Sequence, residues 1–143
     1  MASTGKAKGA LLGAIRKAGY EHAAIHGQKG YHGVAILSKL PLSMIDRRDY
    51  CNIGDSRHVS AIVEPEPGRK IRVHNFYVPA GGDEPDPDIN PKFAHKLKFL
   101  EEMRLLHAEA EQHAGVSSIL VGDLNIAPLE TDVWSHKQLL KVV

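Results

Sequence analysis

Asp123 and Asn125 are the residues whose types and spacing are best suited to chemistry. They follow an apolar run at 119–121, within the segment 117–128, which predicts a strand buried on both faces in the middle of a sheet. Two residues apart in an extended segment, the carboxylate and the amide would point to the same side and could reach one substrate group or one metal-bound water. Asp and Asn at a strand end are more often turn residues, so the spacing alone is a weak signal. The position of the two residues at the carboxyl end of a buried strand strengthens this signal, because ligands bind there in layered α/β sheets.

Hydrophobic periodicity predicts the elements that must position this segment. Strands are expected at 20–25, 33–37, 41–45, 57–63, 70–78 and 117–121, and helices at 11–18 and from Lys92 to near Gly115. The turn 64–69 joins two of the strands into an antiparallel hairpin. A hairpin followed by a helix and a buried strand indicates an α/β layered fold.

Two of these elements have side-chain patterns that predict which face is used. Alternation in the strand 70–78 places Ile71, Val73, Asn75 and Tyr77 on one side. The apolar positions of the long helix follow a period of 3.6 residues and are Phe93, Leu97, Leu100, Met103, Leu106 and Ala110. Tyr77 lies near the end of its strand, where by itself it is more often a half-buried aromatic residue than a phosphate contact.

Two loops and one helix are further candidates for ligand contact. The loop 27–33 is punctuated by glycines and can approach a ligand closely, and the loop 79–91 is too long for a simple connector. Lys92, Lys96 and Lys98 could contact phosphates, although a solvated helix face is the commoner explanation. The nine histidines show no pair with helix-face metal spacing and a carboxylate partner, which favours surface or packing roles.

Composition restricts the class of protein. With 143 residues, 43% of them hydrophobic, the chain is expected to form a single domain over 1–143. A net charge of +1 excludes binding to nucleic acid by overall charge, so local basic patches would have to do it. The single Cys51 suits a reducing compartment, and no apolar run approaches the roughly 18 residues of a membrane span, so we expect a cytoplasmic protein without membrane contact. The basic residues 1–8 begin a helix or form a disordered leader.

Four segments together resemble the bacterial exodeoxyribonuclease III family, in the abasic-site endonuclease branch of the exonuclease/endonuclease/phosphatase superfamily. The segments are Gly-Gln-Lys-Gly-Tyr-His-Gly-Val-Ala-Ile-Leu-Ser at 27–38, Arg-His-Val-Ser at 57–60, Asn-Phe-Tyr-Val-Pro-Ala-Gly-Gly at 75–82 and Leu-Val-Gly-Asp-Leu-Asn-Ile-Ala-Pro at 120–128. They occur in the family's order, and the match covers its central segment. Together they are far more specific than any one motif.

The resemblance implies a partial four-layered α/β sandwich with mixed, mostly antiparallel sheets and flanking helices. It also implies Mg²⁺- or Mn²⁺-dependent hydrolysis of phosphodiesters in double-stranded DNA with abasic sites or 3′ ends: 3′–5′ exonuclease, 3′-phosphatase and abasic-site incision in base-excision repair. By that analogy Asp123 would orient or deprotonate the attacking water, Asn125 would hold the water or a phosphate oxygen, and Tyr77 would hydrogen-bond the phosphate. Positions that face the DNA backbone in the family correspond to Gln28, Lys29, Tyr31, His32, Arg57 and Lys96.

The chain departs from the family pattern on both sides of the matched segments. The family opens with a strand carrying Trp-Asn-x-Asn and a strand ending in Gln-Glu, whose Glu is the principal metal ligand, and neither precedes Gly27. It closes with an Asp-bearing strand and a Ser-Asp-His segment, and neither occurs before Val143. We therefore expect an apparently truncated domain in which Asp123 and Asn125 form a partial metal site.

Three hypotheses for function follow. The first is a nuclease of exodeoxyribonuclease III type that is inactive, or nearly so, as this chain alone. The second is a noncatalytic module that holds DNA or a complementary fragment of the same fold through the basic loop and helix. The third is a small-molecule or lipid phosphatase of the same superfamily. Arg57, Lys96 and the Gly-Gln-Lys-Gly loop favour DNA over such substrates.

Overall fold

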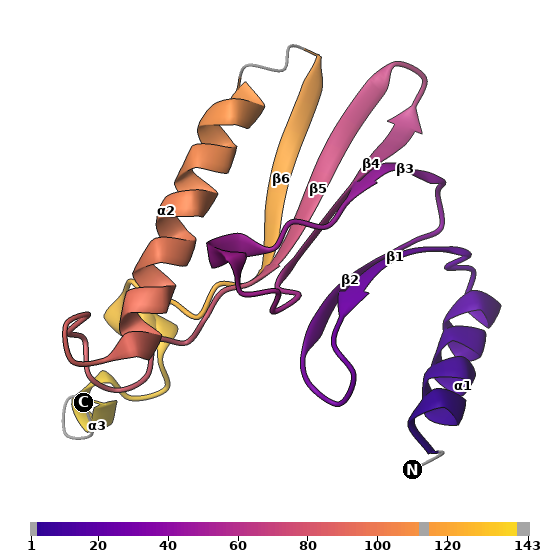
Figure 1. Cartoon of the computed structure of the whole chain (residues 1–143). Coiled ribbons are helices and arrows are strands. Elements are labelled where there is room, and N and C mark those ends of the chain that lie inside the picture. The colour runs from indigo at the N-terminus through magenta and orange to yellow at the C-terminus, as the bar shows by residue number, and fades with distance from the viewer. Residues whose placement is uncertain (1–2, 112–114, 140–143) are drawn as a thin grey trace.

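The computed structural model describes residues 3–111 and 115–139 (Figure 1). The helices are α1 (Ser3–Lys17), α2 (Pro91–Glu111) and α3 (His136–Leu139), with 3₁₀ turns at Tyr50–Asn52 and Glu130–Asp132. The strands are β1 (His22–Gly27), β2 (Gly33–Ser38), β3 (Leu42–Asp46), β4 (His58–Glu66), β5 (Arg69–Tyr77) and β6 (Val116–Asp123). No helix in these two ranges is long and apolar enough to cross a membrane.

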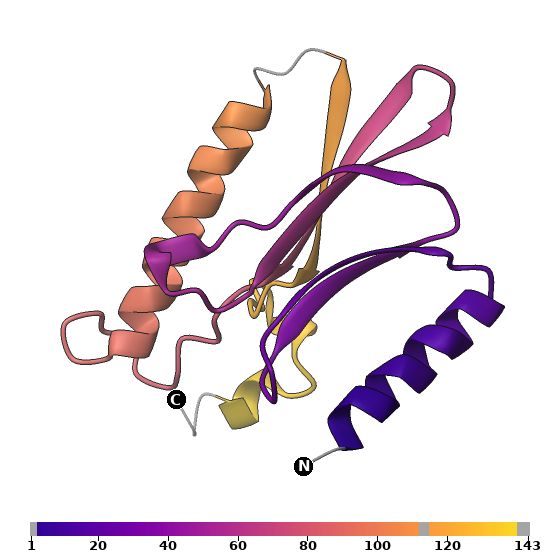
Figure 2. The ribbon, with the colours of Figure 1, turned by 45° about the vertical axis from the view of Figure 1, so that its right-hand side comes forward.

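The described strands form two sheets. β1 and β2 make an antiparallel pair, and the other sheet has the order β3-β4-β5-β6. β3, β4 and β5 are antiparallel neighbours, which confirms the predicted hairpin, whereas β6 runs parallel to β5. Figure 2 shows four layers in succession, α2, the four-stranded sheet, the β1–β2 sheet and α1. The mixed α/β architecture predicted from the sequence is therefore confirmed.

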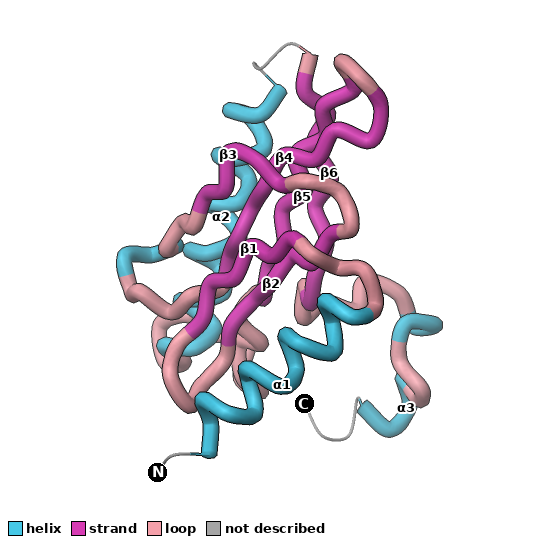
Figure 3. The backbone as a smooth tube through the Cα atoms, turned by 90° about the vertical axis from the view of Figure 1, so that its right-hand side faces the viewer, coloured by secondary structure: helices cyan, strands magenta, loops and turns pink. Residues whose placement is uncertain are grey.

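One hydrophobic core lies between the two sheets. Val59 and Ala61 of β4 are buried against Ala24 of β1 and Val34 of β2. Figure 3 looks onto β1 and β2 where they lie over β4 and β5. The predicted alternation of β5 holds here, because the Asn75 Nδ2 donates a hydrogen bond of 2.8 Å to a carbonyl of β2.

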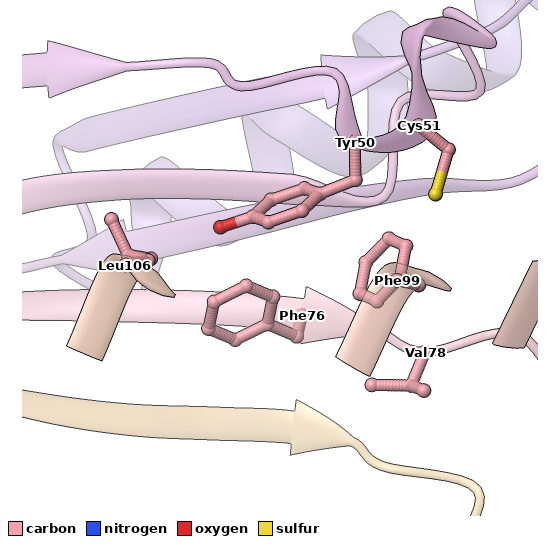
Figure 4. Packing of buried hydrophobic residues seen from close by; sticks show 6 residues of the cluster. All are labelled: Tyr50, Cys51, Phe76, Val78, Phe99 and Leu106. Atoms are coloured by element: carbon pink, nitrogen blue, oxygen red, sulfur yellow. The ribbon is translucent and has the colours of Figure 1, made fainter. Parts of the chain in front are cut away.

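A second core lies between the four-stranded sheet and α2. Phe76 of β5 packs with Phe99 and Leu106 of α2 and with Tyr50 (Figure 4). Phe99 is fully buried although it is not among the predicted apolar positions, whereas Leu97 is 43% exposed. The predicted helix is thus present, but its buried face is shifted around the helix axis.

Two predicted boundaries extend past what the structure describes. The residues 112–114, over which the long helix was expected to continue, lie outside the described residues, as do the side chain of Ala110 and residues 1–2. α1 begins at Ser3, so most of the expected 1–8 leader is helical, and the chain turns at Gly19, whose φ of 87° favours glycine.

The expectation that 117–121 lies buried in the middle of a sheet is wrong. β6 is the end of the strand order, and its side chains at Ile119, Leu120 and Val121 are 46%, 38% and 43% exposed. An apolar run indicates that a strand can be buried on both faces, but burial also needs neighbours. Among the described residues β6 has only β5 beside it.

Candidate active site at the ends of two parallel strands

The candidate site lies where β5 and β6 end side by side. The two strands are parallel and in register, so that Tyr77 pairs with Asp123 at their carboxyl ends. The ladder continues one step further, since the Val78 N–H donates to the Asp123 carbonyl at 2.9 Å. The two residues, each predicted only near the end of its own strand, thus lie opposite one another.

Gly122 sets the approach of β6 to β5 just before Asp123. Its φ is 129°, and a Cβ built there would lie 2.0 Å from the carbonyl oxygen of Phe76. No side chain fits in this space, because real Cβ atoms do not come so close to backbone oxygen. The glycine is thus required for the local strand geometry that places Asp123 opposite Tyr77.

Asn125 reaches the site through a turn rather than through an extended strand. β6 ends at Asp123, and Asn125 has a left-handed φ of 48°. The Asn125 N–H donates to Asp123 Oδ1 at 3.0 Å, and the Asn125 Nδ2 donates to the Val78 carbonyl at 2.7 Å. The assumption of an extended segment was wrong, but both residues still lie together, joined by the local hydrogen bond that is typical of Asx turns.

Lys96 connects α2 to this turn. Its ammonium donates to the Asn125 carbonyl at 2.5 Å and lies 3.3 Å from the Ala80 carbonyl. Burial lowers the pKa of Lys96 from its ordinary value, and the negative charge of Asp123 acts in the opposite direction. Lys96 therefore brings a positive charge to the carboxylate end of the site.

Arg57 and Tyr77 form the other side of the site. The Arg57 guanidinium carbon lies 4.7 Å from the centre of the Tyr77 ring, and its Nη1 donates to the Tyr77 carbonyl at 3.1 Å. The His32 ring meets the Tyr77 ring edge-on at 5.4 Å. The cation and the two rings thus form one packed group at the end of β5.

Asp55 contacts this group through Arg57 and His32, and Asp55 was not among the residues predicted from the sequence. Its side chain is 11% exposed, and its Oδ2 accepts a hydrogen bond of 2.5 Å from the Arg57 Nε. The His32 ring bonds to the Asp55 carbonyl, and the Nε2 of His95 from α2 lies 3.8 Å from Oδ2. Burial lowers the pKa of His95, and Asp55 opposes that shift. The i, i+2 spacing of Asp55 and Arg57 was the available signal.

Only some residues of the loop 27–33 contact the segments around the candidate site. The Gln28 side chain bonds to the Gly54 carbonyl, and His32 joins the Tyr77 group. A Cβ at Gly33 would lie 2.7 Å from the Cα of Gly27, so these glycines close the loop tightly. Lys29 and Tyr31 are exposed at its tip. The structure therefore ties Gln28 and His32 to the segment before β4 and leaves the other two accessible.

The donor set suits a divalent metal ion only in part. Within the described ranges, no group of three or more His, Cys, Asp or Glu residues is arranged to hold a metal. Asp123 supplies one carboxylate, and Asn125 could add one amide oxygen. Mg²⁺ can bind through one or two carboxylates when phosphate oxygens and water complete its shell. That Asp123 and Asn125 form part of a metal site therefore stays a prediction.

Comparison with known proteins gives the context for this geometry. Residues 4–142 match the model of the endonuclease/exonuclease/phosphatase family. The chain belongs to this family. A curated relative, exodeoxyribonuclease III of Haemophilus influenzae, is 33% identical over 114 residues, which make up 78% of this chain and 41% of that protein.

Solved structures of the family show the same arrangement of elements. The 3′-phosphatase NExo (D146N) from Neisseria, bound to product DNA hairpin, superposes with a TM-score of 0.69 at 26% identity, over 88% of this chain and 46% of that one. An AP endonuclease from Archaeoglobus fulgidus gives a TM-score of 0.65 at 28% identity, over 89% and 46%. The chain thus spans less than half the length of these family members.

Proposed function

We propose that the site acts on phosphodiesters of DNA in the manner of exodeoxyribonuclease III, and that these 143 residues supply its phosphate-binding part. The observation that supports this most directly is the meeting of Asp123, Asn125, Tyr77, Lys96 and Arg57 at one sheet edge in a chain of this family. The group combines a carboxylate, an amide, a phenol and two cations. Such a set can position a water and stabilise charge on a phosphate without covalent catalysis.

In this proposal each residue has a role that fits its contacts. Asp123 orients or deprotonates the attacking water, and Asn125 holds that water or a phosphate oxygen from a side chain anchored on the Val78 carbonyl. The Tyr77 hydroxyl donates to a phosphate oxygen. Arg57 lies stacked on the Tyr77 ring and adds positive charge next to it. Charge that builds on the phosphate is thus met by fixed donors.

The metal and the substrate are proposed from the family. Mg²⁺, or Mn²⁺ in its place, would take Asp123 as ligand, and would neutralise negative charge on the phosphate. Double-stranded DNA with abasic sites or 3′ ends is the proposed substrate, supported by relatives described as a 3′-phosphatase bound to product DNA hairpin and as an AP endonuclease. A cytoplasmic location, proposed from the single cysteine, accords with work on chromosomal DNA.

The 143-residue chain alone is proposed to bind DNA with little or no cleavage, because its described residues offer only a partial metal site. The test uses a short labelled duplex with a tetrahydrofuran abasic analogue, with and without Mg²⁺, and measures anisotropy and cleavage. We expect saturable binding that weakens with salt. Absence of binding at low salt would overturn the proposed function. Strong cleavage that is lost in Asp123→Ala would instead show that the chain is a complete catalyst.

A matched pair of lysine variants locates the binding surface. Lys29→Ala removes a charge at the exposed tip of the β1–β2 loop, and should lower the salt slope by about one. Lys17→Ala removes the same charge at the end of α1, which lies at the opposite end of β1 from that loop. Equal losses in the two variants would show binding by general charge, which would contradict a site at this sheet edge.

A further inference from the structure

α2 contacts the candidate site on both of its sides through two successive residues. Lys96 donates to the Asn125 carbonyl, and the His95 Nε2 lies 3.8 Å from the Asp55 Oδ2. Side chains of successive helical residues point about 100° apart around the helix axis, so one helix can reach two separate groups. The distance from His95 to Asp55 is longer than a hydrogen bond, and the contact therefore needs a physical explanation.

The helix that carries His95 holds its ring in place. Asn90 caps the helix, because its Oδ1 accepts a hydrogen bond of 3.0 Å from the Lys92 N–H. One turn beyond His95, Phe99 is fully buried in the core of Figure 4, and its ring meets the His95 ring edge-on at 6.3 Å. The capped helix start and the packed core together restrict the movement of the His95 ring relative to Asp55.

The contact brings together two polar atoms that are closed off from solvent. The His95 Nε2 and the Asp55 Oδ1 are buried, and neither has a hydrogen-bond partner among the described residues. The other carboxylate oxygen, Oδ2, accepts the hydrogen bond from the Arg57 Nε. A buried polar atom without a partner costs free energy, so a donor placed beside this carboxylate is favoured. An N–H group on the His95 Nε2 is such a donor.

His95 is neutral at pH 7.5, so the position of its one ring proton matters. Burial lowers the pKa of His95 from its ordinary value of 6.5, and Asp55 opposes that shift. Arg57 and Lys98 lower the pKa further, whereas Glu102 raises it. A neutral imidazole carries its proton on either Nδ1 or Nε2. A proton on Nε2 points a donor at the carboxylate, and a proton on Nδ1 would leave two acceptors facing each other.

We propose that His95 is a positioning residue of the candidate site, whose Nε2–H donates to the Asp55 carboxylate and orients it to hold the Arg57 guanidinium. The consequence for DNA rests on the proposed function, in which Arg57 adds positive charge beside the phosphate. α2 then supports both cations of the site. It carries Lys96 itself, and it holds Arg57 through His95 and Asp55.

The first measurement is the tautomer of His95 in the free chain at pH 7.5, determined from the ¹⁵N shifts of the two ring nitrogens. We expect the Nε2–H form, because the carboxylate accepts from that nitrogen. Asp55→Ala removes the acceptor and should shift His95 towards a mixture of both forms, while the spectrum of His22 in β1 stays unchanged. The Nδ1–H form in the unaltered chain would overturn the proposal.

The second measurement is a double-mutant cycle on the affinity for the labelled abasic-analogue duplex. His95→Leu removes the donor and should lower the affinity by about threefold. His95→Gln keeps an N–H near the Nε2 position and should stay within about twofold of the unaltered chain. Because His95 acts through Asp55, His95→Leu should have no further effect in the Asp55→Asn background. Additive losses, or equal losses in His95→Leu and His95→Gln, would overturn the proposal.

His22→Leu is the matched control, because it makes the same substitution in the half-buried start of β1 and should leave the affinity unchanged. A loss in this variant equal to that of His95→Leu would overturn the assignment to His95. If the unaltered chain binds no DNA, the proposed function fails. The tautomer in the free chain then decides by itself whether His95 supports Asp55.

Discussion

β5 and β6 run side by side in one register, and each ends in a residue of the candidate site, yet they are held in different ways. β5 lies between two cores, with Phe76 1% exposed against α2 and Asn75 bonded to β2. β6 is the end of the strand order, and Ile119 is 46% exposed. The Tyr77 side of the site is therefore positioned by packing, and the Asp123 side by backbone pairing and short-range hydrogen bonds.

The difference shows that one site can depend on two kinds of support. Tyr77 is fixed by the Arg57 guanidinium, the His32 ring and the buried Asp55 beneath them. Asp123 and Asn125 depend on the fit of Gly122 and on the bonds from Asn125 to Val78 and from Lys96 to Asn125. Changes in the core should therefore affect the first group, and changes in backbone geometry the second.

The largest expected effect is Gly122→Ala. The new Cβ would meet the Phe76 carbonyl oxygen, so the two strands must separate at that point. We expect the amides of β6 to lose more than about 3 kcal/mol of protection in hydrogen exchange, while the β4–β5 hairpin stays protected. Gly13→Ala in α1 is the control, because nothing lies within reach of its Cβ, and it should stabilise the helix by about 0.5–1 kcal/mol. Unchanged protection of β6 would show that pairing with β5 does not hold it.

The next effect measures the contrast in packing directly. Phe76→Ala removes a ring that contacts both Tyr50 and Phe99, and should lower the free energy of unfolding by about 3–4 kcal/mol. Ile119→Ala in β6 should cost less than about 1.5 kcal/mol, because its side chain is already 46% exposed. Urea unfolding of both variants checks this. Similar costs would mean that β6 is buried by contacts that this fold does not account for.

The sequence predicted local features well and features that depend on distant neighbours poorly. The alternation of β5 placed Asn75 correctly, because it depends only on the strand repeat. The apolar run of β6 predicted burial on both faces, but burial is decided by which strands lie beside it. In α2 the spacing of apolar residues allowed two overlapping faces, and the one with Phe99 is buried rather than the one with Leu97.

The candidate site shows the same division. Asp123, Asn125 and Tyr77 were proposed as site residues from motif and strand position, and the structure brings them together. Asp55 and His95 were missed because they meet across 40 positions of the chain, between the segment before β4 and α2. No local pattern predicts such a contact. The i, i+2 pair of Asp55 and Arg57 gave the only local signal.

A further effect is the loss of stability in acid, which should arise from the packed strands β4 and β5 alone. His58 and His74 lie on β4 and β5, and burial lowers their pKa values to about 3 and about 4, from 6.5. The unfolded chain takes up protons below pH 6.5, whereas the folded chain takes them up only near pH 4 and below. Stability is thus present above pH 6.5 and falls as the pH decreases from 6.5 towards 4, by about 2 kcal/mol at pH 5 for each of the two histidines.

Urea unfolding at pH 7.5, 6 and 5 checks this dependence. Replacing both residues in His58→Gln/His74→Gln should reduce the loss of stability between pH 7.5 and 5. His22→Gln, in the half-buried start of β1, is the control and should leave the slope unchanged. An unchanged slope in the double variant would assign the acid sensitivity to other groups and remove it from the β4–β5 side.

The smallest effect, Asp55→Asn, tests whether packing on the β5 side positions Arg57 for DNA. The Asp55 carboxylate accepts a hydrogen bond of 2.5 Å from the Arg57 Nε. The substituted asparagine keeps the shape of the side chain but loses the negative charge that holds the guanidinium. Removing a negative charge should by itself strengthen DNA binding. If Asp55 is a positioning residue, the duplex affinity should instead fall by about three- to tenfold, measured by anisotropy at fixed salt. Asp83→Asn, in the exposed loop before α2, removes the same charge and should leave the affinity equal or slightly higher. A rise in both variants would mean that Arg57 needs no support from Asp55, and the contrast between a packed and an unpacked side of the site would then not extend to its charged groups.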